Sequence, residues 1–229
     1  YMFYTDSGRQ TIRLVTSDNP WRFDFSKSKL VAEADNKVYK LSRRKFRDCY
    51  VFHNETEKLW WMLIEATSDN AVAAALFKSK DLLTWTQHDP VFKDKTRRHG
   101  SCPQIFQTGR RWYLTCLDYG TWCYAADSPY GPWKLSGQYH SKFLTAASRH
   151  ATDGKRRLCW GFFAKYPTPE RKLRGYGGPL GVGRELVFNA KGSLGVRPLP
   201  ELIAAIRKPP NNANIFNCAE TLAGTCTSM

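Results

Sequence analysis

The sequence predicts an all-β fold in which short strands form small sheets arranged as a β-propeller. Three observations support this prediction: apolar strands recur in four units, turns rich in Gly, Asn, Asp and Pro separate them, and helical periodicity is nearly absent. Each unit spans about 45 to 60 residues, enough for one four-stranded sheet. Radial repetition of such sheets produces a propeller.

The four units share one plan, in which apolar strands lead to a small or polar turn that ends in Trp or Phe. Their apolar segments are 1–4 and 12–15; 50–52, 59–64 and 73–77; 105–106, 112–114 and 122–125; and 158–163, 186–188 and 194–196. Turns that end in tryptophan follow at 16–21, 79–85 and 127–133. Hairpin turns at 54–58, 108–111, 153–155 and 189–192 lie where a strand must reverse.

Beyond the last strand, the pattern changes. The segment from Pro200 to Arg207 is the single candidate for a short helix, and residues 209–212 have the composition of a linker. The residues after this linker show little pattern, which is typical of the beginning of a further, truncated domain.

Length and composition limit the classes of protein to which the chain can belong. The chain has 229 residues, is 42% hydrophobic, and lacks an apolar run long enough to cross a bilayer, so we expect a soluble globular protein without a membrane partner. Its first residues resemble a strand and carry no secretory signal. A chain that begins inside a strand is expected to be a fragment, and its compartment stays open.

Cysteine usage does not favour a metal or a disulfide framework. The seven cysteines include no C-x-x-C pair, and their number is odd. We expect most of them to be buried free thiols, and we expect no cofactor.

The formal charge of +15 raises the possibility of a nucleic-acid or polyanion partner, because phosphates attract Lys and Arg. The basic clusters at 43–45, 95–98, 110–111, 155–157 and 171–174 fall at turns between apolar strands. No helix carries a basic face and no nucleic-acid motif is present, so solvated basic turns are the favoured interpretation.

Five short motifs occur in order along the chain. They are Phe46-Arg47-Asp48; Ser79-Lys80-Asp81-Leu82 with Trp85; Ser101-Cys102-Pro103-Gln104; Gly177-Gly178-Pro179-Leu180 with Gly183-Arg184-Glu185-Leu186; and Pro198 to Leu202. In this order they resemble the F-R-D-P, S-x-D-L-x-x-W, E-C-P-D, G-G-A-L…P-R-E-L and P-x-P-E-L motifs of glycoside hydrolase family 32, the fructan and sucrose hydrolases. The resemblance spans nearly the whole chain. It implies a five-bladed propeller with about four blades present in residues 1–205, and a linker or truncated C-terminal domain at 206–229.

The resemblance also implies a funnel with three carboxylates: a nucleophile in the first blade, a transition-state stabiliser in the R-D motif, and an acid/base in the E-C motif. Retaining hydrolysis needs one carboxylate to trap the glycosyl cation and a protonated carboxyl to assist the leaving oxygen. Asp48 matches the stabiliser. The nucleophile loop, W-M-N-D-P-N-G in the family, would precede Tyr1 and is absent from this chain. Ser101 stands at the acid/base position, where its hydroxyl can bind a sugar but cannot deliver a proton near neutral pH.

Further candidates for substrate binding are Arg47, His99, Cys102 and Tyr176. Arg47 should favour the ionised form of Asp48, although a structural ion pair at a strand start is the alternative. His99 offers a substitute proton donor because imidazole titrates near neutrality, and a solvated loop residue is the alternative. Cys102 is expected to pack rather than react. Tyr176 matches a frequent funnel tryptophan of the family and is the candidate stacking platform.

Other polar and aromatic residues rank lower. Glu65 and Asp118 are each predicted at a strand end, where either side chain would reach the funnel, and Glu185 is expected to form a structural ion pair. The aromatic residues within the strands are expected to be mostly blade core. They are Trp60, Trp61, Trp112, Tyr113, Trp122 and Trp160.

Three hypotheses for function follow. The first is a family 32 protein that acts on β-fructosides or related furanosides by retaining hydrolysis, impaired by Ser101. The second is a non-catalytic carbohydrate-binding propeller, since loss of a general acid removes rate but leaves binding contacts. The third, a polyanion or nucleic-acid binder, is supported by the net charge alone.

Overall fold

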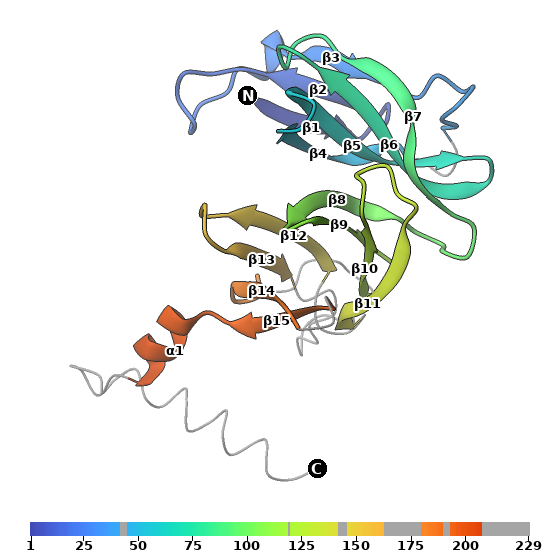
Figure 1. The fold of residues 1–229 in the computed structure, drawn as a ribbon. Helices are drawn as coiled ribbons and strands as arrows, with labels where there is room; N and C mark the ends of the chain where they lie inside the picture. The colour runs from blue at the N-terminus through green and yellow to red at the C-terminus, as the bar shows by residue number, and fades with distance from the viewer. Residues whose placement is uncertain (42–44, 119, 142–145, 163–179, 190–192, 208–229) are drawn as a thin grey trace, which may run out of the picture.

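The fold is seen in a computed structural model that describes residues 1–41, 45–118, 120–141, 146–162, 180–189 and 193–207. Fifteen strands in these residues form four antiparallel sheets that follow one another around a common centre (Figure 1). The predicted all-β propeller is therefore confirmed.

The strands of each sheet pair in chain order. The first sheet holds β1 (Met2–Asp6), β2 (Thr11–Val15) and β3 (Lys29–Ala32), with the 3-10 helix η1 (Phe25–Lys27) before β3. The second holds β4 (Arg47–Asn54), β5 (Leu59–Ser68), β6 (Ala71–Ser79) and β7 (Thr86–Asp94). The third holds β8 (Ser101–Thr108), β9 (Arg111–Leu117), β10 (Gly120–Ala126) and β11 (Lys134–Ser141). The fourth holds β12 (Ala146–Thr152), β13 (Arg157–Phe162), β14 (Arg184–Phe188) and β15 (Leu194–Pro198).

The first sheet differs from the prediction of four strands per unit. In the second and third sheets, the turn that ends in tryptophan joins the third strand to the fourth, at 79–85 and 127–133. The matching turn at 16–21 joins β2 to β3, so β2 and β3 correspond to third and fourth strands. Within the described residues, the first sheet thus has no counterpart of β4, β8 or β12.

Core residues lie between consecutive sheets rather than within one sheet. On β5, Trp61 and Leu63 pack toward the third sheet, while Met62 and Ile64 pack toward the first, because side chains alternate along a strand. A strand buried on both faces is apolar throughout, which explains the run at 59–64. Trp61 is 0% exposed and Trp112 is 7% exposed, so these aromatics are core, as predicted.

The first strands of the last three sheets lie at the centre of the arrangement, where β8 contacts both β4 and β12. The predicted helix is present as α1 (Pro200–Arg207), which follows β15 and extends away from the sheets (Figure 1). No described helix has the length and apolar character needed to cross a membrane. Residues 209–212, the predicted linker, lie outside the described residues.

Candidate functional site

The central strands β4, β8 and β12 share one irregularity near their first residues. Pairing with the second strand of each sheet shifts register between Arg47 and Tyr50, between Ser101 and Gln104, and between Ala146 and Arg149. In each strand two residues therefore face one residue of the partner, which is a β-bulge.

In each bulge, the first residue that has no register partner adopts a left-handed backbone conformation. The φ angles are 58° at Asp48, 53° at Cys102 and 50° at Ala147. Non-glycine residues rarely adopt such angles, and bulges of this kind redirect side chains next to functional sites. The two recognised motifs, R-D and S-C, thus occupy equivalent positions on neighbouring strands.

The bulges bring Asp48 and Cys102 together. Cys102 Sγ lies 3.6 Å from Asp48 Oδ2, and the backbone N–H of Asp48 donates to Thr5 Oγ1 at 3.1 Å. The Asp48 side chain is 32% exposed, so one part of it is held by protein and another is open to a ligand. Contacts from β1, β4 and β8 fix its position.

Arg47 pairs more closely with Glu65 than with Asp48, in contrast to the expected Arg47–Asp48 pair. Its Nε lies 2.9 Å from Glu65 Oε2 and 3.9 Å from Asp48 Oδ2. The two residues are register partners on β4 and β5, so their side chains leave the same face of the sheet. Burial is the largest influence on the pKa of Arg47 and acts to lower it, but the hydrogen bond and charge of Glu65 together with the charge of Asp48 raise that pKa overall.

Glu65 also links the two motifs. The hydroxyl of Ser101 donates to Glu65 Oε1 at 2.9 Å, and Glu65 is fully buried in the middle of β5 rather than at a strand end, which corrects the prediction. A single Glu within an apolar strand is the sequence signal that marks this residue. Because the Ser101 proton is committed to Glu65, the Ser101 oxygen can only accept a hydrogen bond from a ligand.

The thiol of Cys102 is not an activated nucleophile. Burial raises its pKa to about 12, with the neighbouring Asp48 carboxylate acting in the same direction. Burial likewise raises the pKa of Cys49 to about 11. Reactive cysteines have lowered pKa values, so these thiols contribute shape and packing.

Among the other candidates, Asp118 and Glu185 have partners outside this cluster. His99 lies in the segment between β7 and β8, and Tyr176 lies outside the described residues. Asp118 follows β9 and accepts a hydrogen bond from the backbone N–H of Arg98 at 3.3 Å. Glu185 forms a bidentate pair with Arg197 of β15, as expected of a structural ion pair.

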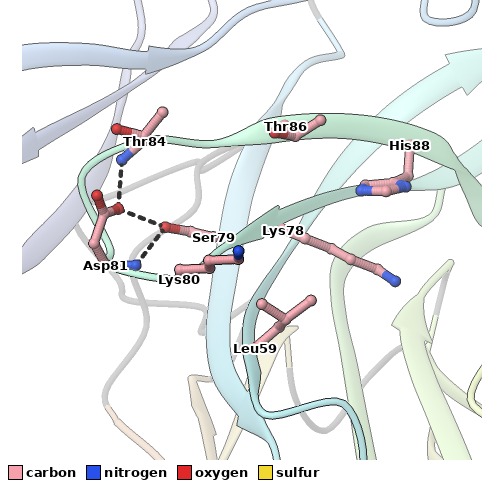
Figure 2. A pocket seen from close by; sticks show the side chains of 8 residues that line it. All are labelled: Leu59, Lys78, Ser79, Lys80, Asp81, Thr84, Thr86 and His88. Atoms are coloured by element: carbon pink, nitrogen blue, oxygen red, sulfur yellow. Dashed lines mark hydrogen bonds between the residues drawn. The ribbon is translucent and has the colours of Figure 1, made fainter.

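Two cavities occur near these elements. One, of about 330 Å³, lies among the central strands and is lined by Phe3, Cys49, Tyr50, Val51, Gln104, Arg149 and His150; we call it the channel cavity. The other, of about 520 Å³, lies beside the predicted turn at 79–85 and shares no lining residue with the first (Figure 2). There the main cation, Lys78, is already held by Glu57 at 2.7 Å and by the Tyr130 hydroxyl at 2.6 Å.

The described residues contain no group of three or more His, Cys, Asp or Glu side chains that could hold a metal ion. The five described cysteines, Cys49, Cys102, Cys116, Cys123 and Cys159, are free. Cys218 and Cys226 lie outside the described residues.

Residues 1–198 match the family described as Glycosyl hydrolases family 32 N-terminal domain. No curated protein matched the sequence. Among solved structures, fructan 1-exohydrolase IIa from Cichorium intybus aligns with a TM-score of 0.67 at 18% identity, covering 91% of this chain and 46% of that one.

Two further structures have the same fold. The GH32 β-fructofuranosidase of Bombyx mori has a TM-score of 0.60 at 18% identity, with 90% of this chain and 49% of that one covered. Sucrose-6-phosphate hydrolase from Lactobacillus gasseri has a TM-score of 0.65 at 12% identity, with 88% and 46% covered. Variants of the Cichorium and Bombyx proteins were solved with 1-kestose and with sucrose. The chain spans about half the length of these proteins.

Proposed function

The chain belongs to glycosyl hydrolase family 32, and we propose that it binds β-fructosides of the sucrose, inulin or levan type at the site around Asp48, with retaining hydrolysis as its inherited reaction. The observation that carries this proposal is the 3.6 Å contact between Asp48 and Cys102, which joins two family motifs from neighbouring strands at one point. The sugars bound by the similar Cichorium and Bombyx proteins support the choice of ligand.

Asp48 has the chemistry of a transition-state stabiliser. Cleavage of a fructoside develops positive charge on the ring, and a carboxylate held beside the ring lowers the energy of that state. The bulge of β4 and the bond to Thr5 hold Asp48 before any ligand arrives, so little reorganisation is needed on binding. Its exposed part is available to sugar hydroxyls.

Ser101 sets the expected level of activity. A serine hydroxyl does not protonate a leaving oxygen, and general acid catalysis contributes roughly two to four powers of ten in rate. The hydrogen bond to Glu65 leaves Ser101 as an acceptor for a sugar hydroxyl. We therefore expect slow hydrolysis, or binding without hydrolysis. The second outcome defines the alternative function, a non-catalytic carbohydrate-binding propeller, and the Ser101–Glu65 bond is the observation that favours it.

Calorimetric titration with sucrose, 1-kestose, short inulin and short levan tests the proposal, combined with an assay for released fructose. Asp48→Asn keeps the shape and removes the charge, so sugar affinity should fall about tenfold, the cost of one charge-assisted hydrogen bond. Asp127→Asn is the matched control, because Asp127 is 95% exposed and lies far along the chain at the end of the third strand of its sheet.

The outcomes separate the candidate functions. Binding with fructose release that Asp48→Asn abolishes supports hydrolysis, and binding without release supports the carbohydrate-binding alternative. If none of the four sugars binds, both are wrong. A polyanion function would instead require heparin binding that weakens steeply as salt concentration rises.

A further inference from the structure

The channel cavity is built from equivalent positions of three sheets. Tyr50, Gln104 and Arg149 are the residues at which regular pairing resumes after the bulges of β4, β8 and β12, and all three line the cavity. The strands β4, β8 and β12 that carry them follow one another at the centre of the arrangement (Figure 1). Two of them are neutral and one is a guanidinium.

The guanidinium of Arg149 has no acidic partner. Arg149 forms no ion pair with any carboxylate in the described part of the chain, and its buried Nη1 atom has no hydrogen-bond partner there. A buried donor without a partner costs free energy, and more so when it is charged. Arg47 on β4, in contrast, lies 2.9 Å from Glu65.

The positive charge of Arg149 acts on the thiols of Cys49 and Cys102, which lie beside and within the two motifs. Burial raises the pKa of the Cys49 and Cys102 thiols, and the positive charge of Arg149 acts in the opposite direction on both. Arg149 therefore lies within electrostatic range of Cys49 on β4 and Cys102 on β8. Arg149 is half-buried and lines the channel cavity.

We propose that the channel cavity is an anion site in which Arg149 binds a phosphoryl group, either as free phosphate or carried by a sugar. Guanidinium groups pair with phosphate oxygens through two parallel N–H donors. Tyr50 on β4 adds a neutral phenol to the lining, while the side-chain amide of Gln104 on β8 is already bonded to the backbone of His150 at 3.0 Å and 3.4 Å. The net charge of +15 raises the local concentration of anions around the molecule.

Asp48 gives this site a distinctive property. Its carboxylate contacts Cys102, and the charge of Arg149 acts on the pKa of the same Cys102 thiol. The negative charge of Asp48 should therefore repel an anion bound in the cavity. Removal of the Asp48 charge should strengthen phosphate binding while it weakens binding of a neutral fructoside. The anion site does not depend on the proposed fructoside function, and the two effects have opposite signs.

Titration of the whole chain with inorganic phosphate, at constant ionic strength with chloride as the exchanged ion, tests the proposal by calorimetry and by amide chemical shifts. Arg149→Gln should weaken phosphate binding at least tenfold, and Asp48→Asn should strengthen it several-fold. Arg110→Gln is the matched control, because Arg110 is exposed in the turn between β8 and β9 and its loss changes net charge equally. This control should bind phosphate as the native chain does.

Fructose 6-phosphate and fructose distinguish the source of the phosphoryl group. Tighter binding of fructose 6-phosphate than of phosphate identifies a sugar phosphate, whereas equal or weaker binding identifies the free anion. If Arg149→Gln and Arg110→Gln lose phosphate affinity equally, only the overall charge attracts phosphate, and the proposal is wrong. If Arg149→Gln does not fold, the native chain still tests the proposal. Phosphate bound in the cavity should change the amide chemical shifts of residues 49–51, 104 and 150, whereas phosphate bound elsewhere would leave those shifts unchanged and overturn the proposal.

Discussion

The hydroxyl of Ser101 donates a hydrogen bond to Glu65 Oε1 at 2.9 Å, across the boundary between the second and third sheets. Glu65 is 0% exposed and its other oxygen holds Arg47 Nε at 2.9 Å. The carboxylate that contacts position 101 thus comes from β5 rather than from β8. This arrangement determines how the site responds to substitution.

Ser101→Glu is expected to destabilise the chain unless Glu65 is changed as well. The new carboxylate would meet Glu65 in a buried position with Arg47 as the shared cation, and one uncompensated buried charge costs on the order of 3 kcal/mol. Ser101→Glu combined with Glu65→Gln should recover most of this loss, because the amide donates to the new carboxylate. Urea unfolding measures both.

Ser101→Ala is the control for this pair of variants. It removes one hydrogen bond to a charged acceptor and leaves Glu65 with Arg47, at a cost of about 2 kcal/mol. A Ser101→Glu variant as stable as Ser101→Ala would show that the two carboxylates do not meet.

Ala147→Gly is expected to stabilise the chain by about 0.5 to 1 kcal/mol. Ala147 has φ 50°, and a left-handed backbone costs a residue with a Cβ more than the added chain entropy of glycine. Ala151→Gly, in the extended part of the same strand, should instead destabilise by a similar amount. Thermal unfolding measures both variants. Melting temperatures that change in the same direction for Ala147→Gly and Ala151→Gly would contradict the bulge in β12.

The five described cysteines should resist alkylation in the folded chain. Burial raises the pKa of Cys102, Cys116 and Cys123 to about 12, and that of Cys49 and Cys159 to about 11. At pH 8 the thiolate fraction is then roughly 0.1% or less, and the thiolate is the reacting form. Peptide mass spectrometry after iodoacetamide treatment, with and without urea, should show modification of these residues only in urea.

The turn before β13 should loosen only at very low pH. Backbone N–H groups of Arg156 and Lys155, then the Arg156 side chain, lower the pKa of Asp153 from 3.8 to about 2. Because the folded chain favours the ionised form, the contribution of Asp153 to stability is fully present above about pH 4 and is lost as pH falls through about 2. Carbon NMR titration of this carboxyl should give a midpoint near 2, and a midpoint of 3.8 would contradict the turn geometry.

Features that depend on local sequence were predicted correctly. Strand alternation and turn residues identified the four sheets, and Pro200 and Arg207 are the ends of α1 as predicted. The turn at 79–85 joins β6 to β7 because Ser79 and Asp81 bond neighbouring backbone groups, which needs no partner from elsewhere. The first sheet was the exception, since counting apolar segments does not show which strand of a unit is present.

The structure brings the two motifs to one place. Arg47, Asp48, Ser101 and Cys102 do come together, because each pair begins a central strand. The buried role of Glu65 and the unpaired charge of Arg149 were not predicted, since these residues lie on other strands and belong to no motif.

The sequence by itself determined the strands, the turns and the positions of the two motifs, because hydrophobic alternation and turn chemistry act over a few residues. Only the tertiary structure decided which charges pair. Ser101 and Glu65 are 36 residues apart, and the bond between them depends on how two sheets pack. Bulges in β4, β8 and β12 then decide which side chains face the channel, because an extra residue in a strand changes the direction of those near it.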